Sequence, residues 1–158
     1  MADEASRFAG GLVVHNLAET EQLARRIAAH LRVGDAIALV GELGAGKTTL
    51  ARAVLRALGV KGEVPSPSFT LVQEYETPGL RIAHCDFYRV VQPSELDEIG
   101  LEDALATGAA MIEWPERASG RIPPDALVIR IGVVGESERS MQLAGPKRWA
   151  CLLEGGKA

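Results

Sequence analysis

Apolar and polar residues follow one another in blocks that predict alternating strands and helices. Residues 36–40 (AIALV) are continuously apolar, and residues 109–112 (AAMI) form a second run of the same kind. Continuous apolar runs are typical of strands that are buried on both faces of a sheet. The chain is therefore expected to build its core around such strands.

Two segments have the apolar spacing of helices that bury one side. The first can be capped by Asn16 or Thr20 and ends at Gly34, and its apolar stripe consists of Leu23, Ile27 and Leu31. The second covers residues 47–58 and ends at Gly59, because glycine readily takes the left-handed conformation found at helix ends. Each stripe needs a sheet or another helix to cover it.

Two pairs of segments predict β-hairpins. Residues 69–75 alternate between two faces and are joined to residues 80–85 by a Thr-Pro-Gly turn. Residues 126–134 and 139–143 flank a second polar turn that contains glycine. This second hairpin is expected to close one edge of the sheet.

The remaining segments predict shorter elements. Residues 12–15 form a short strand. Residues 94–97 (SELD) have a capping-box pattern that opens a short helix, and residues 101–105 continue that helix or form another as far as Gly108. The tail at 147–153 fits a helix or a strand. Together the elements predict an α/β fold in a single domain spanning residues 1–158, with a mostly parallel central sheet, helices on both faces and a terminal β-hairpin.

Charge and composition narrow the function. The chain has a formal net charge of −4, the wrong sign for a surface that grips nucleic acid phosphates, so any contact with RNA is expected to run through a partner. No apolar run approaches the roughly 20 residues that span a bilayer, and the first residues carry no apolar leader, so we expect a cytoplasmic protein without a membrane role. Cys85 and Cys151 have no metal or redox spacing and are expected to be reduced thiols.

A glycine-rich loop joins the first buried strand to the second helix and matches G-x-x-x-x-G-K-[ST]. Its candidate nucleotide-binding residues, with the residue that follows, are Gly41, Glu42, Leu43, Gly44, Ala45, Gly46, Lys47, Thr48 and Thr49. Glycines let backbone N–H groups point inward at an anion, and the helix directs its positive end to the same place. A turn that merely needs glycines would explain Gly44 and Gly46 but not Lys47 and Thr48. The motif predicts binding of ATP, with Lys47 on the β- and γ-phosphates and Thr48 on Mg²⁺.

Two carboxylates at predicted strand ends are candidate partners of this loop. Asp86 can hold Mg²⁺ directly or through water, or it can be a surface or helix-capping residue. Glu113 can bind the metal or polarise the attacking water, or it can form a structural salt bridge, and we favour the catalytic role. The expected metal ligands are Thr48, Asp86 and Glu113.

Three further residues are candidates for the site. Thr70, in the loop formed by residues 66–70, can sense the γ-phosphate as switch loops do and is our third catalytic candidate with Lys47 and Glu113, although these residues can simply form a turn. Trp114 is expected to cover the nucleotide or contact a partner, or to pack in the core. Arg139, at the start of the last hairpin, is a candidate nucleotide contact.

Two other features remain open or are set aside. Arg89 can pair with a phosphate or with Asp97. His84, Cys85 and Asp86 stand side by side, but neighbours in a strand face opposite sides, so they do not predict a metal cluster.

Four stretches of the chain resemble the bacterial TsaE family, formerly called YjeE. They are the glycine-rich loop, SPSFTL at 66–71, HCDFYR at 84–89 and IEWPE at 112–116. Their order and spacing span about half the chain. The family usually carries threonine at the position of Ser68, a change that preserves the hydroxyl.

The resemblance implies an ATPase that supports threonylcarbamoyladenosine modification of tRNA together with the TsaB and TsaD proteins. In that picture ATP hydrolysis resets the assembly, and tRNA is met only indirectly. Two other interpretations remain. A small-molecule kinase would need an acceptor pocket and an arginine-rich lid, which the sequence does not display. A nucleotide-gated interaction module would hold ATP without turnover, and Glu113 and the metal-ligand candidates argue against it.

Overall fold

The computed structural model describes residues 6–118 and 120–154, which form one sheet with helices packed against it. The strands are Arg7–Val14 (β1), Ala36–Val40 (β2), Val72–Thr77 (β3), Leu80–Asp86 (β4), Gly108–Glu113 (β5), Leu127–Val133 (β6) and Arg139–Pro146 (β7). The α-helices are Leu17–His30 (α1), Lys47–Ala57 (α2), Leu101–Thr107 (α3) and Cys151–Glu154 (α4). Short 3-10 helices are Pro93–Glu98 (η2), Pro115–Ala118 (η3) and Lys147–Ala150 (η4).

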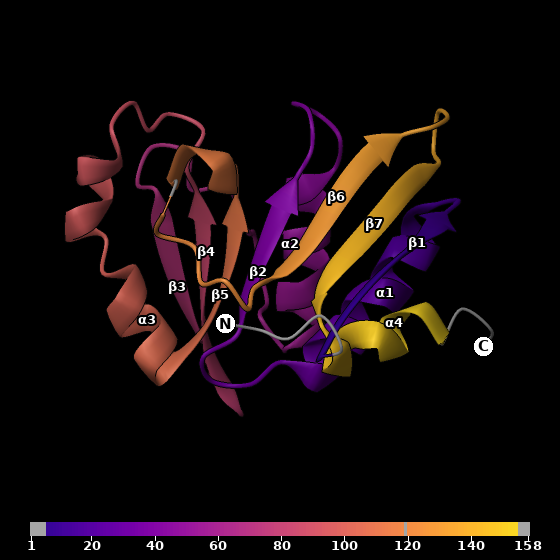
Figure 1. Cartoon of the computed structure of the whole chain (residues 1–158), viewed down its shortest axis with the longest axis horizontal. Helices are drawn as coiled ribbons and strands as arrows, with labels where there is room; N and C mark the ends of the chain where they lie inside the picture. Colours follow the sequence, from indigo (N-terminus) through magenta and orange to yellow (C-terminus); the bar gives the residue numbers. More distant parts are fainter. Residues whose placement is uncertain (1–5, 119, 155–158) are drawn as a thin grey trace.

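The sheet has seven strands in the order β1-β7-β6-β2-β5-β4-β3 (Figure 1). Its four central strands, β6, β2, β5 and β4, are mutually parallel, and the remaining pairs are antiparallel. The predicted α/β fold with a parallel centre is confirmed. Because the carboxyl ends of the parallel strands meet at one edge of the sheet, upper in Figure 1, the loops that follow them lie together.

The edge of the sheet beyond β7 differs from the prediction. The hairpin of β6 and β7 does not form the edge of the sheet. All eight residues of β1 pair antiparallel with β7, so β1 is the edge strand. β1 also starts earlier than residue 12, since Gly10 and Gly11 continue the strand instead of breaking it. A Cβ on Gly10 would collide with the side chain of Leu153, so the missing side chain lets the last helix pack against the strand.

Local interactions fix the two longest helices. The side chain of Asn16, not that of Thr20, caps α1 by accepting a 2.9 Å hydrogen bond from the N–H of Glu19. α2 begins at Lys47 as predicted and is followed by Gly59, whose φ of +104° is the expected left-handed value.

Two other boundaries were predicted wrongly. β3 begins at Val72 and not at residue 69, because Leu71 has a φ of 69°, which interrupts extended backbone. The predicted helix start at Ser94 is part of η2, where the N–H of Gln92 donates to the carboxylate of Glu95 over 2.7 Å. The ambiguous tail is helical and forms η4 and α4.

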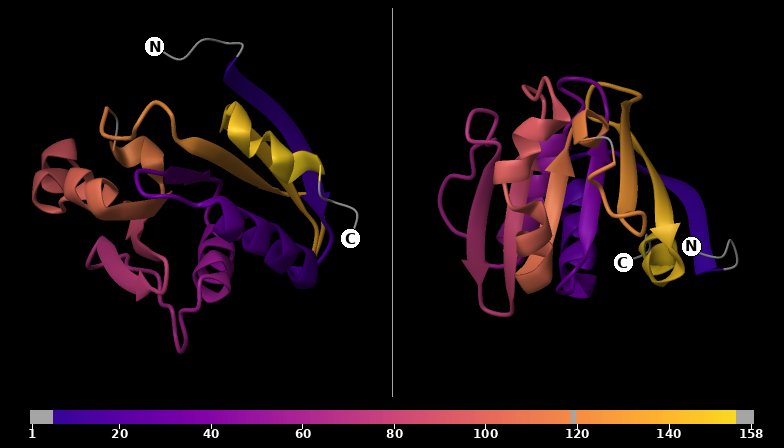
Figure 2. Two further views of the ribbon diagram at one scale, coloured as in Figure 1. Left: turned by 90° about the horizontal axis from the view of Figure 1, so that it is seen from below. Right: turned by 60° about the vertical axis from the view of Figure 1, so that its left-hand side comes forward.

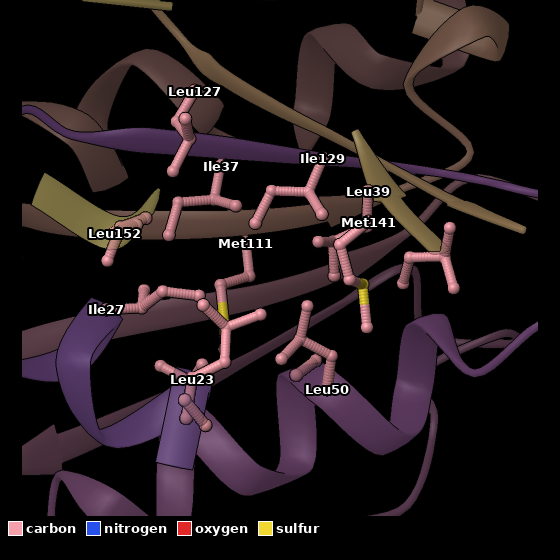
Figure 3. Packing of buried hydrophobic residues seen from close by; sticks show 14 of the residues in the cluster. Leu23, Ile27, Ile37, Leu39, Leu50, Met111, Leu127, Ile129, Met141 and Leu152 are labelled. Carbon is pink, nitrogen blue, oxygen red and sulfur yellow. The ribbon is translucent and has the colours of Figure 1, made fainter. Parts of the chain in front are cut away.

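The hydrophobic core has two parts, one on each face of the sheet. The larger part lies between the sheet and helices α1 and α2, where Leu50 of α2 packs with Leu39, Met111 and Ile129 (Figure 3). The smaller part lies on the opposite face and joins α3, η2 and η3 to β4 and β5 (Figure 2). In the described part of the chain, no helix is long and apolar enough to cross a membrane.

Candidate functional site

The glycine-rich loop connects the end of β2 to the start of α2. Gly44 has a φ of +82° and Gly46 a φ of +114°, and a Cβ on either residue would meet no atom within 4 Å. In the described part of the chain no side chain caps the N-terminus of α2, and the first N–H groups of a helix have no partner within it. The loop therefore directs N–H groups and the positive end of α2 toward one cavity, an arrangement suited to an anion.

Lys47 is the first residue of α2 and is only 4% exposed. Its Nζ donates hydrogen bonds to the carbonyls of Gly41, over 2.6 Å, and Glu42, over 2.8 Å, and lies 4.3 Å from the ring centroid of Trp114. Burial lowers the pKa of this ammonium, and three negative charges act in the opposite direction: those of Glu113, Glu116 and Asp86. The cation is thus fixed over the loop by carbonyls and an aromatic ring.

Glu113 ends β5 beneath the start of α2 and is 2% exposed. Its Oε1 accepts a hydrogen bond from Oγ1 of Thr48 over 2.8 Å. Its Oε2 lies 2.6 Å from Nε2 of His84. The structure therefore brings two of the three candidate metal ligands, Thr48 and Glu113, into direct contact and adds His84 to them.

Asp86 ends β4, next to Glu113 on β5, and is 5% exposed, so it is not a surface residue. Its Oδ2 accepts a hydrogen bond from Oγ of Ser66 over 2.6 Å, and its Oδ1 accepts one from the N–H of Tyr88 over 3.0 Å. Asp86 therefore links the strand end to the loop that precedes β3. It shares the edge of the sheet with Glu113.

Trp114 lies over the glycine-rich loop and is only partly buried. Its φ of 57° turns the chain away from β5, and its ring lies 4.9 Å from that of Tyr88 at an interplanar angle of 56°. It also lines a cavity of about 170 Å³ whose other walls are Leu43, Gly44, Gly46, Lys47, Thr48 and Thr49. Trp114 thus borders the glycine-rich loop and also packs against the smaller core, so core packing is confirmed and contact with a nucleotide stays a prediction.

Arg139 braces the loop from the start of β7. Its Nε donates to the carbonyl of Ala45 over 3.0 Å, and its Nη1 donates to the carbonyls of Gly135, over 3.1 Å, and Glu138, over 2.9 Å. A second cavity of about 220 Å³ lies beside it, lined by Asn16, Leu17, Thr20, Ala45, Gly46, Thr49, Ile131, Ser137, Arg139 and Met141. Arg139 therefore reaches both the loop backbone and this neighbouring cavity.

Thr70 is not joined to the glycine-rich loop. It is exposed in the turn before β3, and within residues 6–118 and 120–154 its side chain makes no hydrogen bond. The neighbouring Phe69 is 81% exposed and stacks with the guanidinium of Arg89 at 4.2 Å. Arg89 does not pair with Asp97, which forms a salt bridge with Arg121 instead.

Sequence reasoning missed the roles of His84 and Ser66. The alternation of side chains that argued against a metal cluster also places His84 and Asp86 on one face of β4, opposite Cys85, which packs in the smaller core. That signal was available in the sequence. The contact between His84 and Glu113 could not be predicted from the sequence, because it depends on β4 and β5 being neighbours. Over the described ranges, no three His, Cys, Asp or Glu residues are arranged to hold a metal ion by themselves.

Comparison with known proteins assigns the chain to a family. The family model for "Threonylcarbamoyl adenosine biosynthesis protein TsaE" matches residues 14–141. The chain is 36% identical over 129 residues to the tRNA threonylcarbamoyladenosine biosynthesis protein TsaE of Rickettsia felis, covering 81% of this chain and 75% of that protein. It is 35% identical over 127 residues to the protein of that name from Bacillus subtilis, covering 80% and 79% of the two chains.

A solved structure supports the same assignment. The crystal structure of YdiB from Bacillus subtilis matches 95% of both chains with a TM-score of 0.77 and 29% sequence identity. The α/β fold of P-loop NTPases predicted from the glycine-rich loop is thereby confirmed. The chain belongs to the TsaE family of tRNA threonylcarbamoyladenosine biosynthesis proteins.

Proposed function

We propose that this TsaE-family protein binds ATP with Mg²⁺ and hydrolyses it to support tRNA threonylcarbamoyladenosine biosynthesis, acting with the TsaB and TsaD proteins. The hydrogen bond between Thr48 and Glu113 carries the proposal, because it sets a buried carboxylate against the first turn of the helix that follows the glycine-rich loop. Anion-binding geometry alone would suit any phosphate ligand. A carboxylate in that position adds a group that can act in hydrolysis.

Two of the cavities that border the loop suit a nucleoside triphosphate. The phosphates would lie in the cavity of about 170 Å³, within reach of the first N–H groups of α2 and of Nζ of Lys47. Gly46 and Thr49 line both this cavity and the one of about 220 Å³. The nucleoside would therefore extend from the phosphates past Thr49 toward Arg139.

The oxygen atoms around Thr48 fit a small, hard cation. The Thr48 hydroxyl and the Glu113 carboxylate are 2.8 Å apart, and Asp86 ends the neighbouring strand. Oxygen donors of these kinds are the ligands that Mg²⁺ prefers. When bound, Mg²⁺ would neutralise charge that develops on the β- and γ-phosphates.

Glu113 would serve the hydrolytic step. Its Oε1 faces Thr48 and the glycine-rich loop, where it can orient a water molecule and accept a proton from it. Lys47 would hold the phosphates at the start of α2, and Trp114 would limit access of bulk water from above the loop. Asp86, whose Oδ2 accepts a hydrogen bond from Ser66, would contribute to binding Mg²⁺.

Phosphate release measured with the purified protein, alone and with a TsaB and TsaD pair, tests this function. We expect slow release alone and faster release with the pair. Lys47→Ala should abolish both, because it removes the buried ammonium, whereas Lys61→Ala, at an exposed lysine after α2, should change neither. Absence of ATP turnover by the native protein under both conditions would overturn the proposal.

A further inference from the structure

His84 lies under the candidate site with no exposed surface. It belongs to β4, and its Nε2 is 2.6 Å from Oε2 of Glu113 on the neighbouring strand β5. Both partners of this contact are buried, since the side chain of Glu113 is 3% exposed. A buried hydrogen bond is stronger than an exposed one, because the local dielectric constant is low.

The surroundings of His84 decide which ring nitrogen carries the hydrogen. Within the described ranges, Nδ1 of His84 is buried and has no hydrogen-bond partner. A hydrogen on Nδ1 would therefore be a buried N–H without an acceptor, whereas a hydrogen on Nε2 points at a carboxylate oxygen. The ring is expected to carry its hydrogen on Nε2 and to donate it to Glu113.

This bond and the one from Thr48 hold Glu113 at both oxygens. Oε2 is fixed from below by His84, and Oε1 accepts from the Thr48 hydroxyl at the start of α2. If the hydrogen bond from His84 were lost, the carboxylate of Glu113 could rotate about its side-chain bonds. Hydrogen bonds behind a ligand or catalytic group commonly set its orientation in this way.

We propose that His84 is a positioning residue for Glu113. Its Nε2–H holds Oε2 so that Oε1 faces Thr48 and the glycine-rich loop. This inference rests on the proposed ATP hydrolysis and adds a residue to that site. Because His84 acts through Glu113, it should affect turnover more than nucleotide binding.

Two substitutions of similar polarity separate positioning from packing. Glutamine carries its amide nitrogen as many bonds from the backbone as Nε2 of His84, so His84→Gln can still donate to Glu113. Asparagine carries its amide nitrogen as many bonds from the backbone as Nδ1 of His84, and among the described residues Nδ1 has no hydrogen-bond partner. His84→Asn therefore removes the bond to Glu113 while keeping a polar amide in the same place.

The experiment measures the ATP dissociation constant and kcat of phosphate release, with the TsaB and TsaD pair present, for the native protein and both variants. We expect His84→Asn to lower kcat by about tenfold or more while its ATP affinity changes by less than about threefold. His84→Gln should recover most of the lost kcat. Thermal unfolding of all three proteins records any loss of folded protein.

An unchanged kcat in His84→Asn would overturn the inference, as would equal losses of kcat in both variants. In the native protein, a ¹⁵N NMR spectrum of the histidine rings that places the hydrogen of His84 on Nδ1 would also overturn it, even if a variant failed to fold. Absence of turnover in the native protein would instead overturn the proposed function. The two failures are therefore told apart by different measurements: turnover of the native protein for the function, and the ring spectrum and the variants for His84.

Discussion

Asp86 and Glu113 occupy paired positions at the ends of β4 and β5, so two buried carboxylates stand side by side at one edge of the sheet. Their hydrogen bonds differ. Glu113 is joined to Thr48 in the glycine-rich loop, whereas Asp86 is joined to Ser66 in the loop before β3. This division gives the two acids different expected roles.

Replacing Glu113 should separate turnover from binding. Glu113→Gln keeps the shape of the side chain and removes the charge that orients water, so we expect ATP affinity to stay close to that of the native protein and the rate of hydrolysis to fall by about 100-fold or more. Nucleotide titration and phosphate release with the partner pair measure the two quantities. Equal losses of affinity and rate would instead make Glu113 a metal or structural ligand, and Asp86→Asn would then be the variant to compare.

Thr48 should matter most when Mg²⁺ is present. Thr48→Ala removes a hydroxyl that can bind the metal and that donates to Glu113, so ATP affinity should fall more with Mg²⁺ than in EDTA. Thr48→Ser keeps the hydroxyl and is the matched control, expected to retain most of the affinity. Titrations with and without Mg²⁺ check this prediction, and a loss of the same size in both conditions would argue against a metal-binding role for Thr48.

The fold could be predicted where the pattern is local. The apolar run of residues 36–40, its glycine-rich loop and the helix after it are continuous in sequence, and the structure has all three where they were expected. The pairing of β1 with β7 joins residues more than 120 positions apart, and nothing near Gly10 indicates it. The sheet edge was therefore predicted wrongly.

The same distinction applies to the candidate site. Lys47 and Thr48 belong to one motif, and Glu113 ends a strand that the sequence makes visible. The bonds from His84 to Glu113 and from Ser66 to Asp86 depend on which strands are neighbours and on the path of a loop. Residue types alone do not fix those choices, so these two partners emerged only from the structure.

Gly46 should be intolerant of a side chain for reasons of backbone conformation alone. A Cβ there would meet no atom within 4 Å, but the φ of +114° disfavours any other residue. Gly46→Ala should destabilise the protein by about 1–2 kcal/mol and weaken ATP binding. Gly79→Ala is the control, because its Cβ would also enter open space and no left-handed φ is involved. Urea unfolding of both variants tests this, and equal stability losses would contradict it.

The stability of the protein should depend on pH through a pair of side chains at the start of α1. Nδ1 of His15 lies 2.8 Å from Oε1 of Glu19, and this hydrogen bond, followed by the negative charge of Glu19, raises the pKa of His15 above 6.5. A folded-state pKa above the unfolded value means that the folded protein holds the proton more tightly. The resulting stabilisation is complete below the unfolded pKa and is lost as pH rises through the folded one.

The unfolding free energy of the native protein should therefore fall, relative to that of His15→Gln, as pH rises from about 6 to 8. The change should be small, since both side chains are exposed. Glu19→Gln is the matched control. Its amide oxygen can still accept a hydrogen bond from the backbone N–H of His15, but the negative charge is gone. Urea unfolding across this pH range should find the histidine-dependent slope reduced in Glu19→Gln. A difference between native protein and His15→Gln that stays constant with pH would mean that this pair does not stabilise the folded state through its charge.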